Sequence, residues 1–278
     1  QENDCAVPDF FSIGDKYMLL FSSHKRGVQY YLGDYVPGRF EPEFHGRMNF
    51  GPFGLDSGNL CAAFTMLDDN NRRIMFGWVA EGRTEKTQRK TGWSGIMCLP
   101  RVLSISSKGC LNVEPLTEMS LLRRRSIQMA NISLSSEISI PLDDIKGDSI
   151  EIEAEFDVRD TVELGIKILC SPGDEEYTTV LYNRENSSVS ISVSHASLSD
   201  EMVGKSTQQD KIVPSDKESI KLKIYVDRSI IEVFDGSGLA LTKRVYPSRD
   251  DSLGVKVFSR GGTPVVKRLE LWEMASIW

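Results

Sequence analysis

The stretch Ser149-Ile-Glu-Ile-Glu-Ala-Glu-Phe156 decides the fold class, because apolar residues alternate strictly with glutamates. Side chains along a β-strand point alternately to its two faces, so the stretch predicts a strand with one apolar and one charged face. The stretch Ile220-Lys-Leu-Lys-Ile-Tyr-Val226 repeats the pattern with lysines. Helical periodicity is nearly absent from the chain. The sequence therefore predicts an all-β protein whose second half is an antiparallel β-sandwich.

The first part of the chain shows a different β pattern. Short apolar runs recur about every ten residues and are separated by turn sequences such as Gly14-Asp15 and Lys108-Gly109. Such meanders are typical of the blades of a β-propeller. We expect part of a propeller in residues 1–118, a short helical or irregular linker near its end, and the β-sandwich in residues 119–278.

The overall charge excludes several classes of partner. The 278 residues carry 33 basic and 40 acidic side chains, for a net charge of −7, so the overall field does not attract nucleic acid or an anionic membrane. No run of 18 apolar residues occurs that would span a bilayer. No phosphate-binding loop, nucleotide fingerprint or metal-ligand cluster is present, so the sequence requires no cofactor and no metal. Two glycosylation sequons, at Asn131 and Asn186, leave the compartment open, with extracellular, vacuolar or periplasmic locations slightly favoured.

Three stretches carry a family resemblance. Arg72-Arg-Ile-Met-Phe-Gly-Trp-Val, with Gly92-Trp-Ser-Gly-Ile-Met-Cys-Leu-Pro-Arg101, resembles a strand and a "GW(S/A)G…LPR" signature of glycoside hydrolase family 32. Val226-Asp-Arg-Ser-Ile-Ile-Glu-Val-Phe, followed by Thr242-Lys-Arg-Val-Tyr-Pro247, is similar to the hairpin of that family's C-terminal sandwich. Pro8-Asp-Phe-Phe resembles the segment that carries the family's acid/base carboxylate. The resemblance covers nearly the whole chain.

The resemblance implies a five-bladed propeller followed by a sandwich, and cleavage of β-fructofuranosyl bonds with retention of configuration. Retention needs two carboxylates about 5 Å apart, one as nucleophile and one as acid/base. The family's nucleophile motif, "W-M-N-D-P-N-G", does not occur in this sequence, which begins at Gln1. We therefore expect only the last two blades or so, with the nucleophile on missing sequence or on another chain. A partner carrying the N-terminal blades, or an oligomer, would cover the exposed sheets.

The acid/base position is the first candidate catalytic site. Ala6 stands where the ungapped resemblance would place the family's glutamate, and the available carboxylates are Asp4 and Glu2. The two are separated by period two and would point the same way on an extended segment. The alternative is that both are frayed terminal residues. A working acid would need its pKa raised towards neutrality.

Three further residues are candidates for binding the fructose-containing substrate. Trp78 could stack its indole on a furanose ring, although a tryptophan in the core is equally common. Glu81 follows three residues later and could bind hydroxyl groups. Asp56 lies in Leu55-Asp-Ser-Gly, similar to a family "D-x-G" motif before a blade strand.

Three other conspicuous residues are predicted to be structural. Asp9 is expected to accept backbone hydrogen bonds in the turn after Pro8. Trp93 is expected to pack in the blade core, and Glu232 to pair with Lys243 or Arg244 on the adjacent strand.

The sequence is compatible with two functions. The first is the C-terminal portion of a hydrolase that acts on sucrose or fructans. The second is a non-catalytic carbohydrate-binding or interaction module that kept the sandwich and lost the chemistry.

Overall fold

The regular secondary structure of the chain is almost entirely β-strand, as the sequence predicts. A computed structural model describes residues 4–48, 59–205, 207–212, 218–236 and 238–277. The α-helix in this part of the chain is α1 (Glu85–Thr91), and the linker before the sandwich contains the 3₁₀ helix η1 (Thr117–Leu122). No helix among these residues has the length and apolar character that crossing a membrane would require.

The first sheet is a four-stranded antiparallel meander. Its strands, in spatial as well as chain order, are β1 (Ala6–Ile13), β2 (Lys16–Ser23), β3 (Gly27–Val36) and β4 (Arg39–Arg47). The β1–β2 hairpin turns at Gly14, whose φ of 60° lies in the left-handed region that glycine adopts most easily. A bulge shifts the β1–β2 register between Ala6 and Asp9.

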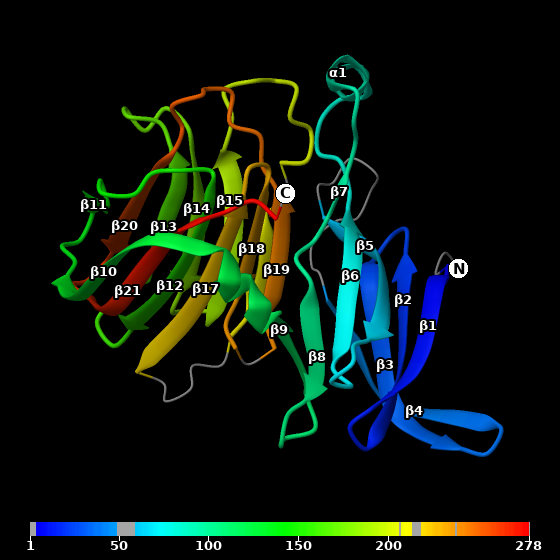
Figure 1. Ribbon diagram of the computed structural model, residues 1–278. Coiled ribbons are helices and arrows are strands. Elements are labelled where there is room, and N and C mark those ends of the chain that lie inside the picture. Colours follow the sequence, from blue (N-terminus) through cyan, green and yellow to red (C-terminus); the bar gives the residue numbers. More distant parts are fainter. Residues whose placement is uncertain (1–3, 49–58, 206, 213–217, 237, 278) are drawn as a thin grey trace.

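The second sheet has five strands and packs against the first. Its members are β5 (Leu60–Leu67), β6 (Arg73–Val79), β7 (Ile96–Met97), β8 (Arg101–Ile105) and β9 (Leu111–Pro115). Strand β6 pairs with both β7 and β8, and helix α1 lies in the connection from β6 to β7. In Figure 1 this sheet stands between the first sheet and the sandwich.

The sandwich consists of two six-stranded sheets. One has the spatial order β10 (Arg123–Ser133), β21 (Val265–Met274), β12 (Ser149–Asp157), β17 (Ser219–Asp227), β18 (Ile230–Phe234) and β19 (Ala240–Arg244). The other has the order β11 (Ser139–Pro141), β20 (Gly254–Arg260), β13 (Glu163–Cys170), β14 (Tyr177–Asn183), β15 (Ser188–His195) and β16 (Gln208–Lys211).

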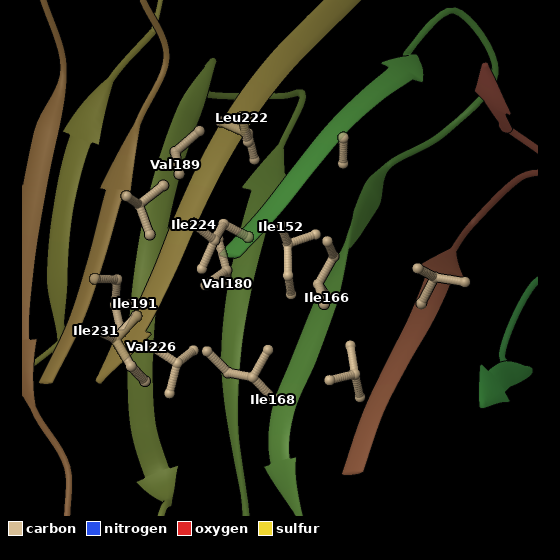
Figure 2. Close-up of a cluster of buried hydrophobic side chains, with 14 of the residues drawn as sticks. Ile152, Ile166, Ile168, Val180, Val189, Ile191, Leu222, Ile224, Val226 and Ile231 are labelled. Atoms are coloured by element: carbon tan, nitrogen blue, oxygen red, sulfur yellow. The ribbon is translucent and has the colours of Figure 1, made fainter. Parts of the chain in front are cut away.

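The sandwich core lies between these two sheets. Figure 2 shows the apolar side chains of β12 and β17 pointing towards those of β13, β14 and β15. Ile152 and Ile224 stand opposite each other in the β12–β17 register, and both are fully buried. The period-two pattern that predicts the sandwich therefore has a direct cause, because every second residue of β12 and β17 belongs to this core.

A second core joins the sandwich to the first sheet (β1–β4) and the second sheet (β5–β9), which together are called the blade-like sheets. It combines residues such as Met18 and Met75 with Tyr225, Phe234 and Ala240, which lie on the outer face of a sandwich sheet. That face of β17, β18 and β19 is therefore covered by the second blade-like sheet, as Figure 1 shows.

Candidate functional site

Asp4 lies just before β1 and is held by the turn between β2 and β3. Its Oδ1 accepts a hydrogen bond from the backbone N–H of His24 at 3.0 Å, and its Oδ2 contacts the Nδ1 of the His24 ring. Both side chains are largely open to solvent. Asp4 is therefore held by contacts of both carboxylate oxygens with His24.

The contacts with His24 favour the charged form of Asp4. The side-chain hydrogen bond from His24, followed by its backbone hydrogen bond, lowers the pKa of Asp4 below its ordinary value. A general acid needs the opposite shift. A second carboxylate placed about 5 Å away would act in that direction, because two negative charges at close range raise the pKa of one of them. The role of Asp4 as acid/base stays a prediction.

Two of the predicted residues lie outside the described part of the chain. These are Glu2, the other candidate acid/base, and Asp56, the candidate sugar ligand.

Trp78 lies on β6, on the face of the second sheet that points away from the first. Its neighbour on that face is Phe76, two positions earlier, which stacks on Phe64 with ring centroids 6.1 Å apart. Met97 is the register partner of Trp78 and is 48% exposed, and Phe64 is 46% exposed. Trp78 is itself half-buried, so it is not a residue of the inner blade core.

Glu81 is buried, at 2% exposure, where the second sheet meets the sandwich. Its Oε1 accepts hydrogen bonds from Arg83 Nε and from the Tyr246 hydroxyl, and its Oε2 accepts from Arg83 Nη2. The backbone N–H groups of Gly82 and Gly95 donate to the same carboxylate. A direct contact with sugar hydroxyls would have to replace these bonds, so the geometry favours a structural role for Glu81.

The pKa of Glu81 reflects this environment. Burial acts to raise it, but the hydrogen bonds from Arg83 and Tyr246 and the nearby charge of Arg244 outweigh burial and lower it to about 2. Glu81 is therefore the anion that balances the two arginines at this junction.

Trp93 lies over these arginines, and the prediction that it packs in the blade core is wrong. It is 45% exposed, with the guanidinium carbons of Arg83 and Arg244 at 4.6 and 5.3 Å from its ring centroid. The two guanidinium groups also lie 4.8 and 5.0 Å from the Tyr246 ring. Cation–π attraction therefore places the indole across the junction, with one face towards the charges.

Glu232 does not pair with Lys243 or Arg244, so that prediction is also wrong. Its Oε2 accepts from Arg101 Nη2 at 2.5 Å, and its Oε1 accepts from the backbone N–H of Leu99 at 2.6 Å. Arg101 is 0% exposed and also donates to the hydroxyl of Thr242. Arg101 ends the Leu99-Pro-Arg stretch of the second sheet, whereas Glu232 lies in the sandwich hairpin, so the two sequence motifs meet in one buried ion pair.

Lys243 contacts the start of the second sheet instead. Its Nζ donates to Asn59 Oδ1 at 3.1 Å, and burial lowers the pKa of this fully buried amine to about 7. Asp9 accepts one backbone hydrogen bond, but its donor lies in the neighbouring sheet and not in the turn after Pro8, where the sequence predicts it. Its Oδ2 binds the N–H and the hydroxyl of Thr65 at 2.8 and 2.7 Å.

Within the described residues, no group of three or more histidine, cysteine or carboxylate side chains is arranged to hold a metal ion.

Comparisons with known proteins relate both parts of the chain to one family. Residues 3–115 match the N-terminal domain of glycosyl hydrolases family 32, and residues 118–273 match the C-terminal domain of that family.

Individual relatives agree with the family match. The chain is 27% identical to a levanase of Bacillus subtilis over 264 residues, covering 91% of the chain and 38% of the levanase. It is 27% identical to a fructan 6-exohydrolase of Beta vulgaris over 318 residues, covering 94% of the chain and 51% of that enzyme. The chain thus spans about half the length, or less, of these relatives.

Solved structures show the same fold. Fructan 1-exohydrolase IIa from Cichorium intybus superposes with a TM-score of 0.86 at 19% identity, over 98% of this chain and 62% of that one. Exo-inulinase from Aspergillus awamori gives 0.82 at 22% identity, over 100% of this chain and 58% of that one. These likenesses confirm the predicted architecture, part of a β-propeller followed by a β-sandwich.

Proposed function

The chain belongs to glycosyl hydrolase family 32, and from this membership we propose that it is the C-terminal portion of a hydrolase that cleaves β-fructofuranosyl bonds in sucrose or fructans. The observation that carries the proposal is the match to both family domains in order, over nearly the whole chain. The buried contact between Arg101 and Glu232 agrees with the family membership, because the two stretches that resemble family motifs meet there.

The proposed mechanism is retaining hydrolysis with two carboxylates. A nucleophile on sequence outside this chain, or on another chain, attacks the anomeric carbon. Asp4 protonates the leaving oxygen and then takes a proton from the water that releases fructose. Glu2 is the alternative acid/base. The contact of Asp4 with His24 supports this assignment by fixing the carboxylate in place, and the nearby nucleophile would raise its pKa.

We propose Trp78 as the stacking surface for a fructose ring, with Asp56 as a hydroxyl ligand. An indole offers a flat apolar face to a sugar ring, and Trp78 is half-exposed at the end of β6. Glu81 is buried, and its hydrogen bonds with Arg83 and Gly95 support an indirect role in which it positions these residues and does not touch the sugar.

The outer faces of the two blade-like sheets carry exposed aromatic side chains, which indicates that further protein packs on them. On the first sheet Phe10, Tyr17, Tyr35 and Phe40 form a cluster of rings with centroids 5.3 to 5.8 Å apart, and Phe10 and Tyr35 are largely exposed. The second sheet exposes the apolar row that contains Trp78. Faces of this kind are normally covered, so we propose that further propeller sheets, from the same protein or from an oligomer, pack on both sides.

The experiment that tests the function measures fructose release from sucrose and from inulin. The chain is assayed alone and together with any upstream coding sequence of its gene. We expect release from the longer protein, and we expect Asp4→Asn to lower kcat by about 10²- to 10⁴-fold. Asp34→Asn is the matched control, because Asp34 is an exposed carboxylate of the same sheet that binds Lys16. An unchanged rate for Asp4→Asn would move the role to Glu2 or another residue.

The second candidate is a non-catalytic carbohydrate-binding or interaction module. The observation that favours it is the pair of contacts from His24 to Asp4, which lower the pKa of this carboxyl and suit a fixed anion better than a proton donor. A protein that binds fructosides but releases no fructose, with or without upstream sequence, would support this candidate and contradict the first.

A further inference from the structure

The hydroxyl of Tyr246 extends from the sandwich into the second blade-like sheet. Tyr246 follows β19, and its hydroxyl donates to Glu81 Oε1 while accepting from the backbone N–H of Gly82 at 3.2 Å. One hydroxyl therefore serves two groups at the point where the chain leaves β6.

The same carboxylate reaches the turn that supports Trp78. Glu81 Oε2 accepts from the N–H of Gly95 at 3.3 Å. A Cβ built on Gly95 would lie 1.9 Å from the Trp78 indole nitrogen, and Gly95 has a φ of +69°. The Gly95 backbone thus packs directly against the edge of the indole, at a distance and in a conformation that only glycine allows.

Backbone hydrogen bonds attach this connection to the sandwich as well. The N–H of Val203 donates to the carbonyl of Gly82 at 2.8 Å, and the N–H of Thr84 donates to the carbonyl of Glu201 at 3.0 Å. The exit from β6 is therefore bonded to a sandwich loop, and a change in the sandwich can be transmitted to it.

We propose that Tyr246 is a positioning residue that, through Glu81 and Gly95, fixes the indole of Trp78 in the orientation that receives a fructose ring. The inference rests on the proposed function, because it takes Trp78 as the stacking surface. It assigns the sandwich a part in substrate affinity in addition to mechanical support.

The physical basis is that the Tyr246 hydroxyl is a specific donor to a buried charge. When it is removed, Glu81 loses one donor on Oε1 and keeps Arg83, Gly82 and Gly95. The N–H of Gly82 loses one of its two acceptors and keeps Glu81 Oε1. A buried carboxylate with a lost donor moves to recover one. Movement of Glu81 changes its bond to Gly95, and the indole that packs on Gly95 has to follow.

The test uses Tyr246→Phe, which removes the hydroxyl and keeps the ring under the arginines. Tyr225→Phe is the matched control, because Tyr225 is also a buried tyrosine of the sandwich and its hydroxyl donates to a carboxylate, Glu151 Oε1, at 2.8 Å. The first readout is the indole ¹H–¹⁵N resonance of Trp78, assigned with Trp78→Phe. We expect Tyr246→Phe to shift it and Tyr225→Phe to leave it in place. Gly95→Ala adds a methyl group that would clash with the indole of Trp78, so it should also shift the Trp78 resonance.

The second readout is the affinity for sucrose or inulin, in the form of the protein that binds them. We expect Tyr246→Phe to raise KM or Kd about three- to tenfold with a smaller effect on kcat, the range given by coupled neighbouring side chains. In the Trp78→Phe background the same substitution should have almost no further effect. If Tyr246→Phe does not fold, Glu81→Gln tests the next step of the same route, because it weakens the bond from Gly95 to this side chain. It should shift the Trp78 resonance, and an unchanged resonance would overturn the positioning role.

Each failure has a separate meaning. An unchanged Trp78 resonance in folded Tyr246→Phe would overturn the positioning role whatever the protein binds. A shifted resonance with additive affinity effects would overturn the link to substrate. A wild-type protein that binds no fructoside would refute the proposed function, and with it the effect on affinity, while the resonance would still report on the positioning.

Discussion

Removing the carboxylate of Glu232 should destabilise the contact between the sandwich and the blade-like sheets. The substitution Glu232→Gln keeps the shape of the side chain and a carbonyl that can accept from Leu99, but it removes the charge that faces Arg101. The guanidinium has no exposure, and among the described residues its Nε and Nη1 have no hydrogen-bond partner. It would be left as a buried cation without a counter-ion.

The expected cost follows from this burial. Breaking a buried ion pair by removing one partner typically destabilises by about 3–5 kcal/mol, because the remaining charge is uncompensated. Arg101→Met instead leaves the Glu232 carboxylate as a buried anion, but this charge can be removed by protonation. Burial raises the pKa of Glu232 even beside Arg101. Without the arginine, Glu232 binds a proton in the folded state at a pH where the unfolded chain does not, so the cost of Arg101→Met should fall as the pH is lowered.

The assay is urea unfolding at pH 7 and pH 5, followed by circular dichroism and tryptophan fluorescence. Both single variants should lower the midpoint at pH 7, and the double variant Arg101→Met/Glu232→Gln should be more stable than either one. Arg89→Met is the control, because Arg89 forms an exposed pair with Glu85 on helix α1 and such pairs contribute little. A loss below about 1 kcal/mol in both single variants would refute the reasoning.

Three further predictions concern the same junctions. Asp9→Ala should destabilise by about 1–3 kcal/mol, because it leaves the N–H and hydroxyl of Thr65 without their acceptor, whereas Asp9→Asn, which keeps an acceptor oxygen, should cost less in the same urea titration. Glu81 has a folded pKa of about 2, below its ordinary 4.5, so it binds fewer protons than in the unfolded chain. Its contribution, up to about 3 kcal/mol, should be present above pH 4.5 and disappear towards pH 2, and Glu81→Gln should flatten that acid limb. Lys243 has a folded pKa of about 7 against 10.5, so the unfolded chain binds more protons between these values. Stability should therefore rise from pH 7 to pH 9.5, and Lys243→Met should remove that rise in thermal unfolding.

The fold could be predicted from the sequence wherever one face of a strand meets solvent. Strand β12 (Ser149–Asp157) alternates in sequence because its two faces meet different surroundings, and that difference is a local property. Helix α1 was not predicted, although its capping signals are present. Thr84 caps its start and Gly92 ends it with a φ of 78°. Its seven residues are too few to display a helical period.

The junction could not be predicted, because its contacts join residues far apart in the chain. Local reasoning placed Glu232 beside a basic residue of the next strand. The β18–β19 register instead puts Thr242 opposite Glu232, so Lys243 points to the other face. The partner of Glu232, Arg101, is 131 positions away. Trp93 was misplaced for a related reason, because the arginines over which it lies come from two different parts of the fold.

The buried positions of two family motifs limit what a match to these motifs indicates about function. The motif that ends in Arg101 and the motif that contains Glu232 meet in a buried ion pair between the sandwich and the second sheet. Neither residue is exposed to a ligand. A match to these motifs therefore indicates how the sandwich is attached, and it does not by itself indicate that a chain is catalytic. A relative could keep both motifs, and the fold, after losing its chemistry. Evidence for catalysis has to come from elsewhere in the chain, and the proposed acid/base Asp4, which contacts His24 in an exposed position, is the residue to test.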